Sequence, residues 1–301
     1  MGVLVKLELL AGATTLDISD IQNFMWAGHA GFGLANLHRL LMRGPQQMGD
    51  TDMGYLLDPR MIQLTTRLMG TDLETLYTYQ DQLLRMLNPS ITPVSLRFTR
   101  LGSGIVRQID TFAVGGLDFP SAQRDGFTML EQIMLRANDP TWYDPTPVLI
   151  GFGAGGGGGA WAIPWAIPWA LGASTANQSQ PFNYPGTANS FPWITLTGPI
   201  NNAIITIADG FTSQKLDFTG VNIAGGDIRF IDCRFSMKSV VDSAGANKNG
   251  DLTTDSNLAT FAVNQCAAGE SVHANTITLV GSGITNVTRL DFNYYNRFIG
   301  V

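Results

Sequence analysis

Alternation of apolar and polar side chains is the commonest pattern along this chain, and it predicts β-strands. Residues 94–100 alternate strictly and place Val94, Leu96 and Phe98 on one face. Residues 62–65 show a shorter version of the same pattern. Two further segments of the first half are compatible with strands, 105–114 and 127–137, with a gap at Gly115-Gly116; the second of them can also be scored as a helix.

One segment, residues 72–87, follows the helical period instead. Its apolar positions recur at helical spacing and predict a face that packs on the core. Thr71 can cap the helix, and Glu74 three residues later completes a capping-box pattern, while Asn88-Pro89 ends it. The predicted face consists of Leu73, Leu76, Tyr77, Leu83, Leu84 and Leu87.

After residue 190 the predicted strands follow one another closely, with turn signals between them and no helical pattern. Short strands at this spacing are typical of a β-sandwich or jelly roll. The candidate strands are 193–197, 203–207, 215–218, 227–235, 259–263, 275–280 and 289–295.

Charge is scarce in this chain of 301 residues, which is long enough for about two domains. Hydrophobic residues make up 45% of the sequence and charged residues only 14%. The scarcity of charge indicates that partner subunits cover much of the surface. The net charge is −6 and Lys and Arg do not cluster, which argues against binding to nucleic acid.

The distribution of charge predicts the domain boundaries, because residues 145–208 contain no charged residue. We expect an N-terminal domain over 1–148, a linker over 149–180 and a C-terminal domain over 181–301. The linker contains five consecutive glycines and two Ile-Pro-Trp units, and glycine runs are costly to order. Its tryptophans, Trp161, Trp165 and Trp169, are candidates for docking on a partner or on the neighbouring domain.

A membrane span over residues 150–171 is rejected, because glycine and proline make a poor helix and unsatisfied backbone is costly in lipid. The N-terminus lacks the basic start and apolar run of a signal peptide, so synthesis in a cytoplasm without general secretory export is the default expectation. Residues 151–156 match GxGxxG, but glycine and Ile-Pro-Trp follow where a dinucleotide site needs a helix.

No pattern of catalytic or metal-binding residues emerges, so we predict no enzyme activity, no cofactor and no metal. The histidines His29, His38 and His273 lack convergent ligands in the sequence and are interpreted as structural or surface residues. Cys233 and Cys266 belong to no CxxC pair, and two separate reduced thiols are favoured over one disulfide.

Some acidic residues leave alternatives open. Asp50 with Asp52, or Asp251 with Asp255, could form a glycosidase pair, although their contexts are turn-like. The turn over 242–251 holds oxygen ligands that could bind Ca²⁺, but it departs from the EF-hand pattern and a hairpin tip is favoured.

Three groups of motifs occur in a recognisable order. The first is Arg-Gly-Pro-Gln-Gln-Met-Gly at 43–49 with Leu-Asp-Pro-Arg-Met-Ile-Gln-Leu at 57–64. The second is Asn-Asp-Pro-Thr-Trp-Tyr-Asp-Pro at 138–145. The third is Tyr-Pro-Gly at 184–186 with Phe-Pro-Trp-Ile-Thr-Leu-Thr-Gly-Pro at 191–199. In this order the motifs resemble the distal tail protein family, often called Dit, of long-tailed bacteriophages.

The resemblance implies a mainly β fold with one flanking α-helix. The N-terminal domain would be a tail-tube-like β-sandwich or split barrel, and the C-terminal domain a galectin-like jelly roll. Six copies would form a ring that joins the tail tube protein to the tip hub protein in the virion, after assembly in the host cytoplasm. The C-terminal domain would carry receptor-binding or side-fibre proteins or contact the host surface. The remaining candidate interaction residues are Trp142, Tyr143 and Trp193.

Three other functions are weighed against this one. A carbohydrate-binding jelly-roll module is the main alternative, since Trp193, Tyr294 and Tyr295 could stack on sugars, although aromatic residues in strands are more often core. A tail-associated hydrolase conflicts with the lack of a catalytic motif in the sequence. Membrane disruption by residues 151–172 is the weakest alternative.

Overall fold

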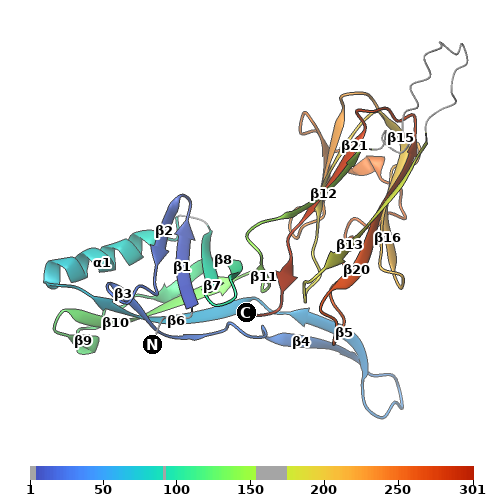
Figure 1. Cartoon of the computed structure of the whole chain (residues 1–301). Helices are drawn as coiled ribbons and strands as arrows, with labels where there is room; N and C mark the ends of the chain where they lie inside the picture. Colours follow the sequence, from blue (N-terminus) through green and yellow to red (C-terminus); the bar gives the residue numbers. More distant parts are fainter. Residues whose placement is uncertain (1–4, 91–92, 154–174) are drawn as a thin grey trace, which may run out of the picture. The chain divides into compact units, whose positions relative to one another are not determined.

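The computed structural model describes residues 5–90, 93–153 and 175–301. This part of the chain is mainly antiparallel β with one α-helix, as the sequence predicts. The chain divides into two compact units (Figure 1). The first unit comprises Met1–Pro145 together with Phe298–Val301, and the second comprises Thr146–Arg297.

The first unit combines the helix with most of the long strands. Its strands are β1 (Val5–Ala11), β2 (Thr14–Asp17), β3 (Phe24–Ala30), β4 (Leu37–Met42), β5 (Thr51–Leu57), β6 (Arg60–Met69), β7 (Val94–Arg100), β8 (Ile105–Gly116), β9 (Arg124–Asp125), β10 (Thr128–Ala137) and β11 (Trp142–Tyr143). The helix is α1 (Leu73–Met86), and a short 3₁₀ turn is η1 (Ser121–Gln123).

Strand β8 links the two halves of the main sheet, whose order is β2-β1-β7-β8-β10-β6-β3. Its beginning pairs with β7, and its last residues pair with β10. Gly116 permits the close approach of the end of β8 to β10, because its φ is +89° and a Cβ would lie 2.2 Å from the Gln132 carbonyl oxygen. The predicted gap at Gly115-Gly116 is therefore no break, and the ambiguous segment 127–137 is a strand.

Helix α1 covers the core of this unit, but its predicted apolar face is only partly buried. Leu76, Leu83, Met86 and Leu87 lie in the core with side chains of β1, β6, β7 and β10. The prediction was wrong for Leu73, Tyr77 and Leu84, which are exposed, because the sheet covers a narrower arc than the apolar stripe spans. The capping residue is Asp72, not Thr71: its Oδ1 accepts the Thr75 amide at 2.7 Å.

The second unit is a β-sandwich, as predicted for the C-terminal region. Its strands are β12 (Val148–Gly153), β13 (Thr175–Tyr184), β14 (Trp193–Thr197), β15 (Ile200–Ala208), β16 (Ser213–Asp217), β17 (Asn222–Ile223), β18 (Ile228–Asp232), β19 (Ser239–Asp242), β20 (His273–Ser282) and β21 (Arg289–Tyr294). The 3₁₀ turn η2 spans Asn249–Asp251, and β22 spans Arg297–Phe298, where the chain passes back to the first unit.

Two antiparallel sheets of five strands enclose one core in this unit. One has the order β12-β21-β14-β18-β19, and the other has the order β13-β20-β15-β16 with β17 beside β15. Both sheets contribute to the buried cluster, for example Ile194 and Phe292 from the first and Ile205 and Leu279 from the second. Cys233 and Cys266 are free thiols, in agreement with the favoured interpretation.

The boundaries of the units differ from the predicted ones in two places. Residues 149–153 and 175–180, assigned to the linker by composition, are strand residues that pair with β21 and β20. The last four residues of the sequence belong to the first unit instead of the second. Trp161, Trp165 and Trp169 lie outside the described residues.

Candidate assembly surface

A two-stranded ribbon, here called the arm, stands apart from the main sheet of the first unit. It consists of β4, β5 and the turn between them, and neither strand pairs with any third strand among the described residues (Figure 1). All six residues of β4 are exposed. An isolated two-stranded ribbon has marginal stability in water, so we expect another protein surface to pack on the arm and stabilise it.

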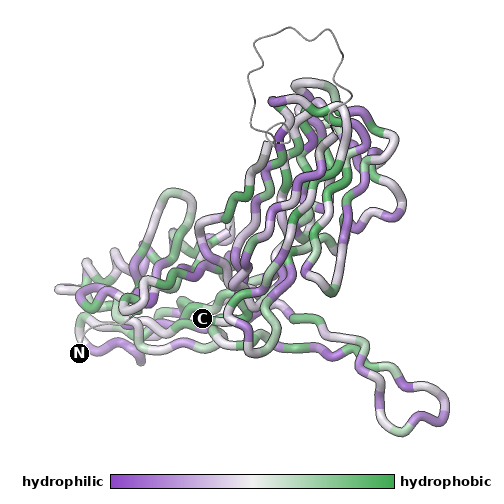
Figure 2. The backbone as a smooth tube through the Cα atoms, turned by 45° about the vertical axis from the view of Figure 1, so that its right-hand side comes forward, coloured by the Kyte–Doolittle hydropathy of each residue, from purple (hydrophilic) through white to green (hydrophobic). Residues whose placement is uncertain are grey.

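The side chains of the arm are unusually apolar for such exposure. Hydrophobic stretches continue along part of the arm in Figure 2, and Leu41 and Leu56 each expose more than half of their surface, at 56% and 57%. Large exposed apolar patches mark surfaces that bind protein. The other exposed apolar side chains of the arm are Leu37, Leu40, Met42, Met48, Met53 and Tyr55.

The charges of the arm neutralise one another across the ribbon. Arg39 forms an ion pair with Asp52, and Arg43 Nε lies 2.9 Å from Asp50 Oδ1. Asp50 and Asp52 therefore pair with separate cations and are not arranged as a glycosidase pair. A neutral, apolar surface resembles the centre of a protein interface, where charged residues are depleted.

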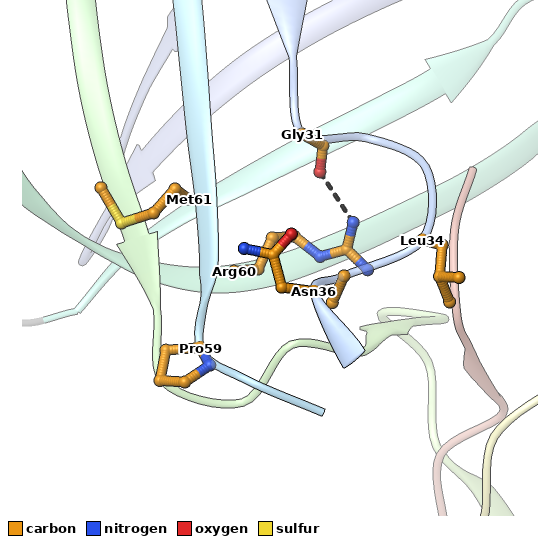
Figure 3. Close-up of a pocket in the computed structure, with 7 residues that line it drawn as sticks. Gly31, Leu34, Asn36, Pro59, Arg60 and Met61 are labelled. Atoms are coloured by element: carbon orange, nitrogen blue, oxygen red, sulfur yellow. Dashed lines mark hydrogen bonds between the residues drawn. The ribbon is translucent and has the colours of Figure 1, made fainter. Parts of the chain in front are cut away.

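Arg60 anchors the base of the arm. It is the first residue of β6, directly after the arm, and only 2% of its surface is exposed. Its Nη1 donates to the carbonyl oxygen of Gly31 at 2.7 Å and also to that of Gly33, both of which precede the arm (Figure 3). Its Nε donates to the Pro140 carbonyl at 2.7 Å, and its Nη2 donates to the Ile299 carbonyl.

The guanidinium of Arg60 thus donates to four backbone carbonyl oxygens, and no carboxylate of the described residues forms an ion pair with it. Burial lowers the pKa of Arg60 to about 10, so the group keeps its charge at neutral pH. Gly31 lets its own backbone lie close to the start of β6. Its φ is +88°, and a Cβ there would lie 2.1 Å from the Met61 carbonyl oxygen. A hollow of about 180 Å³ lies beside this anchor, lined by Gly31, Leu34, Ala35, Asn36, Pro59, Arg60 and Met61 (Figure 3).

Two of the sequence motifs meet at Arg60. The arm carries motif 43–49 at its turn and motif 57–64 at its base, while Pro140 belongs to motif 138–145. In that motif Trp142 is fully buried and packs against Phe32 at a centroid distance of 5.3 Å. The structure thus corrects one candidate: Trp142 is a core residue and is not available to a partner.

Tyr143, the next candidate, is half-buried. Its hydroxyl donates to Asp110 Oδ1 at 2.7 Å and accepts from Gln108 Nε2 at 3.0 Å, so its polar tip is already engaged. Trp193 in the second unit is also half-buried, with the Arg234 guanidinium 5.1 Å from its ring centroid and the Tyr295 ring 5.2 Å away. Tyr294 is buried, so it cannot stack on a sugar.

The third motif group shapes the second unit. The Tyr184 hydroxyl donates to the Ala188 carbonyl at 2.6 Å and accepts the Arg297 amide at 3.0 Å, and burial raises the pKa of Tyr184. Gly186 fits against this ring, because a Cβ there would lie 2.2 Å from the Tyr184 hydroxyl. These motif residues therefore support the fold and form no open site.

The structure also reveals a polar cluster that the sequence did not. His273 Nδ1 lies 2.8 Å from Glu270 Oε2, and its Nε2 lies 3.3 Å from Asp209 Oδ2. The hydrogen bond to Glu270, followed by that to Asp209, raises the pKa of His273 against the opposing effect of burial. Asp209 also accepts the amides of Phe211 and Thr212, so the cluster joins the turn 209–212 to the segment 270–273.

Across residues 5–90, 93–153 and 175–301, no three His, Cys, Asp or Glu side chains gather in a way that could hold a metal ion. Asp251 pairs with Arg229 and Asp255 with Lys215, so they form no shared carboxylate site. The single helix of that part is too short and too polar to cross a membrane.

Known structures provide a comparison for the whole chain. The crystal structure of the SPP1 Dit protein, called a paradigm of the hub adsorption apparatus in phages that infect Gram-positive bacteria, matches with a TM-score of 0.62 at 14% identity. The match covers 97% of this chain and 99% of that one. The chain therefore has the fold of that protein, which confirms the resemblance to distal tail proteins at the level of the fold.

Two baseplate structures of phage P2 in its activated conformation, one with Ca and one with Sr, match more distantly. Their TM-scores are 0.49 and 0.48 at 11% identity, with 99% and 98% of this chain and 100% and 98% of those chains covered. No protein-family model matches the sequence. No curated protein matches it either.

Proposed function

We propose that this chain is a structural protein of the phage tail tip, where six copies form a ring that joins the tail tube to the tip hub. The observation that carries the proposal is the arm, a neutral and apolar ribbon that the described residues leave uncovered, in a chain with the fold of SPP1 Dit. The function is the contact itself, and it requires no catalysis.

The main sheet offers a second means of contact. Among the described residues its path ends at β2 on one side and at β3 on the other. Unpaired strand edges are templates for pairing with another chain, and a closed ring would pair them between subunits. The same assembly would cover the arm, so ring formation would bury both the unpaired strand edges and the exposed apolar side chains of the arm.

The second unit would carry peripheral or receptor-binding components of the tail in the virion, after assembly in the host cytoplasm. The alternative of a glycan-binding module has less support from the geometry. The Lys238 ammonium lies 4.2 Å from the ring centroid of Phe191, and Arg234 lies beside Trp193, so cations already occupy space at these rings.

The proposal is tested with purified protein by electron microscopy and size-exclusion chromatography with light scattering. The wild type is expected to form rings, and a variant with Leu41→Asp and Leu56→Asp is expected to remain monomeric, because each change places a charge in an apolar contact. The matched control is Val287→Asp, which changes an exposed apolar residue of the second unit. A wild type that stays monomeric at high concentration would refute the proposal.

A further inference from the structure

Arg60 joins segments that are far apart in the sequence. Gly31 and Gly33 lead into the arm, and Arg60 itself follows it, so one side chain bridges both ends of the ribbon. The backbone at the base closes beside it, where the Asp58 amide donates to the Asn36 carbonyl at 2.9 Å. The direction in which the arm leaves the unit is therefore set at Arg60.

One acceptor of Arg60 comes from the end of the sequence. Ile299 lies in the segment 298–301, which belongs to the first unit. In this subsection these last four residues of the sequence are called the tail, as distinct from the phage tail. The tail is held by the Phe298 ring, which lies 3.5 Å from the Arg107 guanidinium, and by the Val301 amide, which donates to the Phe32 carbonyl at 3.3 Å. Arg107 in turn pairs with Asp144.

The physical consequence follows from burial. A buried charge is costly unless its donors are satisfied, and each hydrogen bond to a charged group is worth more than a neutral one. Without the tail, the Arg60 Nη2 donor loses the Ile299 carbonyl. The guanidinium would then turn toward water, and its hold on Gly31 and Gly33 would weaken.

We propose that Arg60 is the positioning residue of the arm and that it takes its position only after the tail has docked on the first unit. The tail follows the second unit in the chain, so an arm ready for assembly is restricted to chains whose residues 146–297 have already been made. This inference rests on the proposed function, because it assigns the arm to the contact between copies.

The test measures hydrogen exchange of the Asp58 amide in dilute, monomeric full-length protein. Arg60→Gln, or removal of residues 298–301, is expected to speed this exchange about tenfold or more. Exchange at the centre of β6, at the Leu64 amide, should stay unchanged, which separates positioning of the arm from general destabilisation. Arg67→Gln, an exposed arginine of the same strand, is the matched control.

The combination of both changes supplies a second criterion. Because the two act through one group, the combined variant should exchange no faster than the more affected single variant. Unchanged exchange at Asp58 in the folded single variants, or full additivity of their effects, would overturn the inference. If Arg60→Gln does not fold, Phe298→Ala replaces it, because this variant loosens the tail without altering Arg60. It should also speed exchange of the Asp58 amide. Unchanged exchange at Asp58 in Phe298→Ala would equally overturn the inference.

The exchange experiment does not depend on assembly. Wild-type rings together with unchanged exchange in the variants would reject the tail mechanism and keep the proposed function. Faster exchange in the variants together with a wild type that never assembles would keep the positioning role and reject the ring.

Discussion

The two units handle apolar surface and charge in opposite ways. The second unit encloses its core side chains between two sheets, and its buried Arg229 pairs with a carboxylate, the Asp251 Oδ2 atom 3.0 Å from Arg229 Nε. The first unit leaves the apolar arm exposed and buries Arg60 among carbonyl groups. It also buries Glu131, whose Oε1 has no hydrogen-bond partner among the residues that the structure describes.

Each of these features of the first unit lowers its stability as an isolated fold. Exposed apolar surface favours aggregation, and a buried charge without an opposite charge nearby is costly. In the second unit, by contrast, the buried Arg229 has an opposite charge beside it in Asp251. The difference indicates that the first unit is adapted to contact other proteins, in agreement with the proposed ring.

The largest expected effect contrasts the core of the second unit with the arm. Phe292→Ala should lower the free energy of unfolding by about 3–5 kcal/mol, because it opens a cavity in a closed core. Tyr55→Ala on the arm should change the free energy of unfolding of the monomer by less than about 0.5 kcal/mol. Urea denaturation under monomeric conditions measures both changes in free energy. If Tyr55→Ala lowered the free energy of unfolding as much as Phe292→Ala, the contrast between a closed core and an uncovered arm would be wrong.

The next effect concerns Glu131, on the core-facing side of β10. Burial raises its pKa from 4.5 to about 7, with a hydrogen bond from the Phe119 amide opposing the shift. The folded first unit therefore holds a proton that the unfolded chain releases, so its stability falls as the pH rises from about 4.5 to about 7.

Glu131→Gln should remove this pH dependence and stabilise the first unit at pH 8 by up to about 3 kcal/mol, with little gain at pH 4. Thermal unfolding across this pH range is the measurement. Asp125→Asn, at an exposed carboxylate of β9, is the control. Equal effects of Glu131→Gln at both pH values would show that Glu131 is not the proton-binding group.

The smallest effect concerns His273 in the second unit. Its pKa is raised by Glu270 and Asp209, so its contribution to stability is complete below its ordinary value of 6.5 and is lost as the pH rises through the folded value. His273→Gln should remove this dependence, at a cost at low pH of less than about 1 kcal/mol after solvent screening. His38→Gln on the exposed arm should have no such effect, and an equal pH response of both variants would contradict the assignment.

The sequence predicted the β class, the single helix and the sandwich of the C-terminal region because these depend on local periodicity. It did not predict the arm. Residues such as Leu40 and Leu41 are typical of a buried strand, and periodicity reports which residues are apolar, not whether anything covers them. The exposure of Leu73, Tyr77 and Leu84 escaped prediction for the same reason.

The anchor at Arg60 and the cluster at His273 escaped prediction because their partners are distant in the chain. Ile299 lies 239 positions from Arg60, and Asp209 lies 64 positions from His273. Backbone carbonyls leave no trace in the sequence, so the only available signal was that Arg60 and Pro140 both fall within motifs. The cap at Asp72 shows a smaller failure, in which two adjacent residues could each cap the helix and the choice depended on backbone geometry.

Hydrogen exchange of residues 37–57, compared between dilute protein and the assembled particle, tests the central claim most directly. We expect fast exchange along the arm in the free chain and strong protection in the particle, while exchange in the strands of the second unit remains unchanged. Equal exchange of the arm in both states would contradict the claim that this surface joins the copies.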